Sequence, residues 1–285
     1  MAEAFLDSSI VIGLHFRHAG ERAHCASAIP DGAEQLTSRY VIFEIARGFL
    51  RSLLLLHNAS FEYRTFSEFH QAAHSGQLRF QPYRMHTQLG AFDDYFAALE
   101  AEDGTVTALG RLAEFRAKLR TWIRRGWKQM HAKTRLTNSI GCRDDLQPPF
   151  VRTHDRHLHQ ELPTTECGTP AACGLDDYLI KQAASLSALR LGLRQRPASD
   201  RETERRIAAL GRLVAKARGE SFMGTDCYRC GDAFICHESP VSAVVVSKNR
   251  KHFAVICELL GKAATFPEEA ARLSEADIAR LAPGR

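Results

Sequence analysis

The sequence predicts an α/β protein in which a central parallel sheet lies between helices and is interrupted by a long, mostly helical insertion. Near both ends of the chain, apolar and β-branched stretches predict buried strands, and segments with helical spacing of apolar residues follow them. Strands that alternate with helices favour a parallel sheet. From about residue 60 to 225 the pattern is helical, with loops that contain proline, and we expect no strand there.

The N-terminal elements are a strand and a helix. Residues Ala4–Ile12 combine Phe, Leu, Ile and Val with one acid, Asp7, and two serines, which is typical of a buried strand with a polar site at its end. Thr37 or Ser38 can then cap a helix that runs from Tyr40 to Leu56.

The C-terminal elements repeat this alternation. Gly231–His237 has a helical pattern, and Ala243–Ser247 is a β-branched strand. Lys251–Gly261 is a second helix, for which Gly261 is the stop signal.

Three segments of the chain follow from these elements. Residues 1–60 and 226–285 form the two parts of the core, and residues 61–225 form the insertion between them. Within the insertion, the charges of residues 200–216 alternate in sign, which predicts an exposed helix.

The composition is that of an ordinary globular protein. Of 285 residues, 45% are hydrophobic and 25% are charged, and the formal net charge of +5 permits a polyanionic partner without requiring one. The longest aliphatic run, Leu53–Leu56, is far shorter than the roughly 18 residues that suggest a membrane span. The apolar N-terminal stretch has no basic lead and is broken by Asp7, unlike a signal peptide. We therefore expect a cytoplasmic protein that does not enter a membrane.

Polar residues beside apolar runs predict a site. They are Asp7 in FLDSS, Glu44 in RYVIFEIARGF, Asp232 in GDAFI, and Asn249 in SKNRKHF. Functional groups of an α/β sheet gather outside the carboxyl ends of its strands. We expect Asp7 and Asn249 to lie there side by side, with Glu44 and Asp232 facing the same place from their helices.

These residues resemble the motifs of the PIN-domain nucleases, a family that includes the toxin ribonucleases of bacterial toxin-antitoxin pairs. Asp7 matches the family's first-strand aspartate, Glu44 its helical glutamate, and Asp232 the aspartate of its GDA motif. Ser247 and Asn249 match the site where the family has Thr or Ser, followed two residues later by Asp or Asn. The resemblance covers the first 60 and about the last 60 residues and leaves the middle unmatched.

The resemblance implies a PIN-like three-layer fold and a metal-dependent endoribonuclease. Asp7, Glu44 and Asp232 would be ligands of Mg²⁺ or Mn²⁺, because clustered carboxylates need a hard cation to neutralise them. Ser247 would orient a water or a phosphate. Asn249 departs from the acidic pattern, since an amide brings no charge. The family also implies homodimers and a small antitoxin-like inhibitory partner.

Other interpretations stay open. Asp7 can simply end a strand, Glu44 can be a solvated helix residue, and Asp232 can cap a helix. A degenerate PIN module that binds RNA or a protein without cutting is one alternative function. A DNA nuclease of a defence or repair system is another.

The eight cysteines are expected to be thiols or metal ligands rather than disulfides. Cys227 and Cys230 have C-x-x-C spacing, and Cys167 and Cys173 can supply the other half of a structural zinc site. Free thiols or a redox pair are the alternatives. Apolar surroundings predict that three other cysteines are small core residues: Cys25, Cys236 and Cys257.

A basic segment in the insertion is the strongest local charge bias. Between residues 111 and 135, nine lysines and arginines outweigh one acid, Glu114, and Trp122 and Trp127 lie among them. Such a segment can neutralise phosphates and stack bases, or it can be a solvated helix face whose apolar residues pack inward. The nucleic-acid-binding candidates are Arg116, Arg120, Arg124, Arg125 and Lys128.

Overall fold

A computed structural model describes residues 2–17, 19–78, 108–141, 151–152, 157–159, 174–196, 201–216 and 224–267. The chain forms two compact units. One comprises Met1–Phe43, His131–Asp145 and Pro163–Arg285, and the other comprises Glu44–Met130 and Leu146–Leu162. The predicted insertion is thus divided between the two units, because parts of it belong to the same unit as both ends of the chain.

The first unit is built on a five-stranded sheet in which every neighbouring pair of strands is parallel. The strand order is β3-β2-β1-β6-β7. The strands are β1 (Glu3–Leu6), β2 (Glu34–Ser38), β3 (Arg135–Thr137), β6 (Ala243–Val246) and β7 (Ala264–Thr265). The predicted α/β class and parallel sheet are confirmed.

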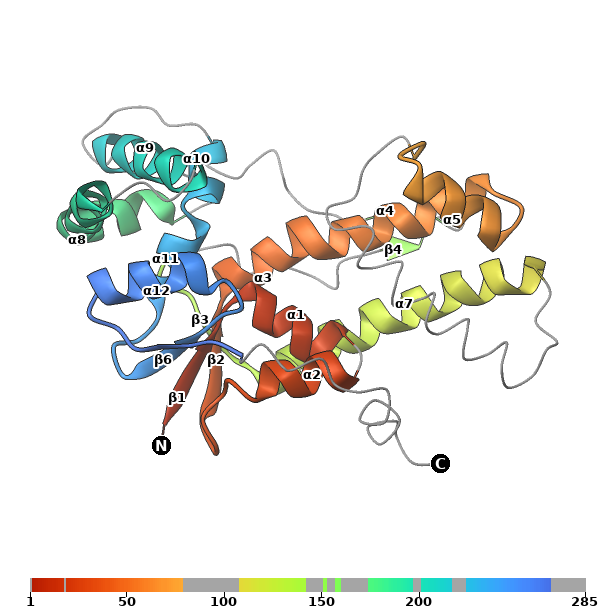
Figure 1. Cartoon of the computed structure of the whole chain (residues 1–285), viewed down its shortest axis with the longest axis horizontal. Coiled ribbons are helices and arrows are strands. Elements are labelled where there is room, and N and C mark those ends of the chain that lie inside the picture. The colour runs from red at the N-terminus through yellow and green to blue at the C-terminus, as the bar shows by residue number, and fades with distance from the viewer. Residues whose placement is uncertain are drawn as a thin grey trace. The chain divides into compact units, whose positions relative to one another are not determined.

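Helices connect the strands of the first unit and pack on one another. α1 packs on α2, α8 on α9 and α12, α9 on α10, and α11 on α12 (Figure 1). Their bounds are α1 (Ser8–Phe16), α2 (Ala19–Ala26), α3 (Arg39–Ile45), α8 (Leu175–Gln195), α9 (Arg201–Lys216), α10 (Gly224–Arg229), α11 (Gly231–Glu238) and α12 (Arg250–Leu259). The last residues of α3 belong to the second unit.

The core of the first unit lies around the central strands. Phe5 and Leu6 of β1 and Val245 and Val246 of β6 have no exposed surface, as expected of parallel strands covered on both faces. Phe234 of α11 is equally buried. The predicted C-terminal elements are confirmed as α11, β6 and α12, and Gly261 ends the last helix with φ of +65°.

The predicted N-terminal strand is too long. β1 ends at Leu6, and Ser8 begins α1, because the Asp7 side chain accepts hydrogen bonds from the amides of Ser8 and Ser9 and caps the helix. The cap turns the β-branched residues that follow into helix. Ser38 also acts as a cap, since its hydroxyl accepts from the amide of Val41 at 3.2 Å.

The expectation that residues 60 to 225 contain no strand is wrong. β3 pairs with β2 at the edge of the main sheet, with Leu36 opposite Arg135. A separate antiparallel pair is formed by β4 (Val151–Arg152) and β5 (Leu158–His159) in the second unit. These strands are two or three residues long, too short to show an alternating pattern.

The described part of the second unit is mainly helical. Where one helix was predicted over Tyr40–Leu56, α3 is followed by a π-helical turn and then by α4. The remaining helical bounds are the π-helix Ala46–Leu50, α4 (Arg51–Ala59), the 3₁₀ helix Ser60–Glu62, α5 (Phe66–His74) and α7 (Ala108–Lys133).

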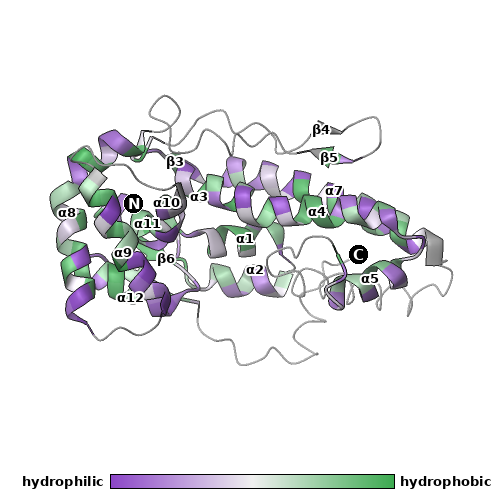
Figure 2. Cartoon of the chain, turned by 90° about the horizontal axis from the view of Figure 1, so that it is seen from above, coloured by the Kyte–Doolittle hydropathy of each residue, from purple (hydrophilic) through white to green (hydrophobic). Residues whose placement is uncertain are grey.

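α7 is amphipathic. Hydrophilic and hydrophobic bands alternate along it in Figure 2, and Leu112, Phe115, Leu119 and Ile123 are buried. Neither α7 nor any other helix of the described residues is both long and apolar enough to cross a membrane.

Candidate functional site

Asp7 and Ser247 leave the sheet side by side. β1 and β6 are parallel neighbours with Leu6 opposite Val246, and the Asp7 amide donates to the Val246 carbonyl at 3.0 Å. The strand order reverses between β1 and β6. In open parallel sheets, ligands bind outside the carboxyl ends of the strands at such a reversal. The topology therefore places both residues where a site is expected.

The Asp7 carboxylate is 4% exposed and accepts hydrogen bonds on both oxygens. Oδ1 accepts from the Ser8 amide at 2.6 Å, and Oδ2 accepts from the Ser9 hydroxyl at 2.6 Å. Oδ2 also accepts from the Ser247 hydroxyl at 2.9 Å. These donors fix the orientation of the carboxylate.

Burial raises the pKa of Asp7, although hydrogen bonds from Ser9 and Ser247 oppose the shift. The negative charge of Asp232 raises the pKa of Asp7 further. The two carboxylates are thus close enough to repel each other, and a cation near both would relieve this repulsion.

A chain of polar contacts connects Asp7 with Asp232. The Asn249 amide donates to the Ser247 hydroxyl at 3.0 Å, and Asn249 Nδ2 lies 2.9 Å from His252 Nδ1. The same His252 nitrogen is 3.0 Å from Asp232 Oδ2. Hydrogen bonding to Asp232 raises the pKa of His252, while burial of the ring opposes this. Loop and helix residues after β6 thus join the two acids.

Arg206 of α9 supplies a buried positive charge at this place. Its side chain is 3% exposed, and Nη2 lies 2.5 Å from Asp232 Oδ2 and 3.2 Å from His252 Nδ1. Residues 200–216 were expected to form an exposed helix, which is wrong for one face of α9. The buried residues of that face recur at helical spacing: Arg206, Ala209, Leu210, Leu213 and Val214.

The structure brings four of the five predicted catalytic residues into one network: Asp7, Asp232, Ser247 and Asn249. The fifth, Glu44, is half-buried on α3 and is the first residue of the second unit. Its predicted place beside the other acids stays a prediction.

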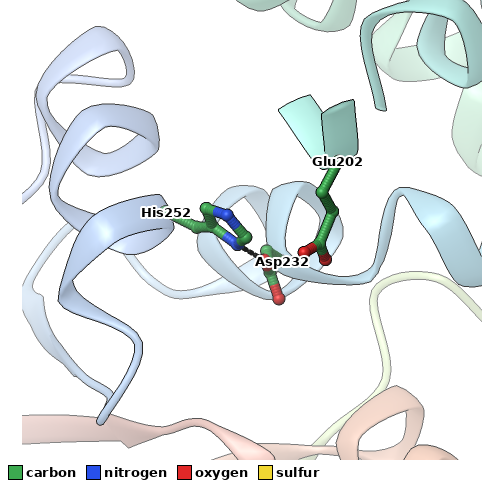
Figure 3. Close-up of side chains that lie close together, drawn as sticks. All are labelled: Glu202, Asp232 and His252. Atoms are coloured by element: carbon green, nitrogen blue, oxygen red, sulfur yellow. Dashed lines mark hydrogen bonds and ion pairs between the residues drawn. The ribbon is translucent and has the colours of Figure 1, made fainter. Parts of the chain in front are cut away.

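Ser9, Glu202, Arg206 and His252 were not among the site residues predicted from the sequence. The signal for Arg206 and His252 was their position on the buried face of an amphipathic helix, where an ionisable side chain needs a partner. Glu202, one turn before Arg206, gave no signal because it is exposed. Figure 3 shows Glu202, Asp232 and His252 projecting toward one another from three helices.

The zinc hypothesis stays a prediction. Cys227 lies in α10 and Cys230 directly follows it, and both are buried and form no disulfide among the described residues. Cys167 and Cys173 lie outside the described residues. The nearby Asp226 of α10 pairs with Arg212. Its carboxylate, with no exposed surface, accepts two hydrogen bonds of 2.8 Å from Arg212. Cys25, Cys236 and Cys257 are buried, as predicted.

The basic candidates of α7 separate into two groups. Arg116 donates to the hydroxyl and carbonyl of Ser60 and lies 4.1 Å from the centre of the Phe61 ring, and Arg120 is 3.2 Å from His57 Nε2. These contacts give both arginines a structural role within the second unit. Exposed side chains remain at Arg124, Arg125 and Lys128.

Comparison with known proteins gives no assignment: no family model, curated protein or solved structure matches the chain.

Proposed function

We propose that the chain is a divalent-metal-dependent endoribonuclease with a PIN-like core. The observation that carries the proposal is the hydrogen bond between Ser247 and Asp7 at the reversal of strand order, within electrostatic reach of Asp232. Support also comes from the order of the FLDSS, GDAFI and SKNRKHF segments, each of which contributes to one polar network.

The donor set suits a hard cation. Asp7 and Asp232 would hold Mg²⁺ or Mn²⁺, because both offer carboxylate oxygens and their mutual repulsion is relieved by positive charge. Glu44 is proposed as a third ligand. The fit is incomplete at Asp232, where Arg206 already provides one positive charge.

The chain's own residues would orient the reaction. A bound divalent ion supplies Lewis acidity toward the phosphate and its attacking water. Asp7 is held rigidly by Ser9 and Ser247, so little reorganisation is needed to present its oxygens. Ser247 has no exposed surface, so we assign it a positioning role through Asp7 rather than contact with substrate.

The test is cleavage of end-labelled single-stranded RNA and DNA by the purified protein with Mn²⁺ or with EDTA. We expect RNA cleavage that needs Mn²⁺ and falls at least 100-fold in Asp7→Asn and in Glu44→Gln. Asp31→Asn is the matched control, because Asp31 is an exposed acid in a turn. Equal cleavage by Asp7→Asn and the wild-type chain would refute the catalytic assignment. Faster cleavage of DNA than of RNA would show that the enzyme is a deoxyribonuclease and not a ribonuclease.

A binding module that no longer cuts is the second candidate. It is favoured by the uncharged amide of Asn249 and by the ion pair between Arg206 and Asp232, which lowers the demand for a metal. RNA binding without metal-dependent cleavage, and without an effect of Asp7→Asn on affinity, is its expected result.

A further inference from the structure

Three side chains from three helices converge beside the Asp7 network. Glu202 comes from α9, Asp232 from α11 and His252 from α12 (Figure 3). One carboxylate oxygen from each acid and one histidine nitrogen all lie within 4.8 Å of one another. Glu202 and His252 are not among the residues that match the nuclease motifs.

The spacing suits a metal ion. With ion–ligand bonds of about 2.1 Å, neighbouring ligands of an octahedral ion lie about 3.0 Å apart. Asp232 Oδ2 and His252 Nδ1 are separated by 3.0 Å. The Glu202 side chain is 70% exposed, so it is free to make the small rotation that would complete the site.

The guanidinium of Arg206 lies within this cluster. Arg206 Nη2 lies 2.5 Å from the Asp232 oxygen, 3.2 Å from the His252 nitrogen and 3.8 Å from Glu202 Oε1. The Arg206 side chain is almost completely buried, yet its Nε has no hydrogen-bond partner among the described residues. The guanidinium is therefore held mainly by the charge of the cluster, and it is incompletely satisfied there.

We propose that Glu202, Asp232 and His252 form a site for a divalent transition-metal ion, and that Arg206 occupies this site until the ion displaces it. A double positive charge between two carboxylates compensates them better than a guanidinium does. The imidazole ligand favours Mn²⁺ over Mg²⁺, because nitrogen is a softer donor than oxygen. The inference goes beyond the proposed nuclease, since Glu202 and His252 are not among the proposed nuclease residues, although both sites would use Asp232.

The first experiment measures Mn²⁺ affinity by calorimetry without nucleic acid, on the wild-type chain and on Arg206→Met. Removing the competing cation is expected to tighten Mn²⁺ binding at least tenfold. Arg205→Met is the matched control, because Arg205 is exposed on the same helix. Unchanged or weaker binding by folded Arg206→Met would overturn the proposal. If that variant does not fold, Arg206→Lys is used instead, because lysine keeps the positive charge on a shorter side chain with one nitrogen. It should show a smaller gain in Mn²⁺ affinity, and no gain would also overturn the proposal.

A second set of variants identifies the ligands. In the Arg206→Met background, Glu202→Gln should reverse the gain in Mn²⁺ affinity, whereas Glu204→Gln, an exposed control on the same helix, should not. Retention of the full gain in Glu202→Gln would exclude Glu202 as a ligand. Asp7→Asn separates the two proposals, because it should abolish cleavage and leave the Arg206 effect in place. A chain that never cuts RNA but shows the Arg206 effect keeps this inference and loses the nuclease.

Discussion

Gly13 and Cys25 set how closely α1 approaches α2, and α1 begins directly after Asp7. A β-carbon added to Gly13 would lie 2.1 Å from Cys25 Sγ and 3.3 Å from Cys25 Cβ. Both residues are buried. Gly13→Ala should therefore force one of these helices, or the Cys25 side chain, to move.

The size of the effect follows from two opposing contributions. Alanine stabilises a helix interior by about 1 kcal/mol relative to glycine. Overpacking a filled core costs about 1 to 3 kcal/mol. Gly13→Ala is thus expected to lower the free energy of unfolding by up to about 2 kcal/mol. In a Cys25→Ala background the sulfur is gone, and the same substitution should stabilise the protein by up to about 1 kcal/mol.

The assay is a double-mutant cycle from urea unfolding followed by circular dichroism, with the coupling between the two sites expected at about 1 to 3 kcal/mol. Gly48→Ala is the control, because a β-carbon there would meet nothing within 4 Å. If Gly13→Ala has the same effect with and without the Cys25 sulfur, the close approach of α1 and α2 is refuted.

Three further predictions concern charge. Asp226→Asn should lower the free energy of unfolding by about 2 kcal/mol, because the buried carboxylate loses its charged hydrogen bonds to Arg212. Urea unfolding measures this free energy, and an unchanged value would mean that the ion pair contributes nothing to stability. Burial lowers the pKa of His15 in the folded protein to about 4, whereas the pKa of this histidine in the unfolded chain is about 6.5. Between about pH 6.5 and about pH 4 the unfolded chain therefore binds more protons, and the stability of the fold should decrease as the pH falls through this range. His15→Leu should remove about 2 kcal/mol of that decrease in urea titrations at pH 7 and pH 4.5, whereas an unaltered pH profile would exclude His15 as the cause. Replacing Arg124, Arg125 and Lys128 together by alanine should weaken the binding of single-stranded RNA. The slope of log affinity against log salt concentration should become shallower by about 2, and an unchanged slope would exclude contact between this face of α7 and phosphates.

The two strands that carry the site could be predicted from local sequence. β1 and β6 are central strands, so their apolar residues are nearly continuous, and the polar residue after each one marks its end. The rule that ligands bind at the carboxyl ends of parallel strands then predicted that Asp7 and Asn249 lie side by side. In the structure Ser247 makes the contact with Asp7, and Asn249 contacts Ser247. What local sequence did not reveal was the end of β1, because capping by Asp7 overrides the β-branched character of the residues that follow.

The edge strands could not be predicted in the same way. β3 contains three residues and β7 two, and each is specified by its partner rather than by its own pattern. β3 joins β2 across about 100 residues of sequence, with Thr37 opposite Leu136. The pairing that stabilises such a strand comes from a partner distant in sequence, so a local pattern gives little indication of it.

The buried face of α9 links the fold to the charge balance of the site. Charge alternation predicts an exposed helix only if every charged residue can remain in water, and Arg206 lies on the same face as Leu210 and Leu213, which the core requires. Burial of that arginine is tolerable because Asp232 and Glu202 lie within reach of its guanidinium. The same acids offer oxygens to a metal ion. A single substitution at Arg206 therefore separates the two roles of the acidic cluster, since a purely structural ion pair would lose stability without gaining affinity for Mn²⁺.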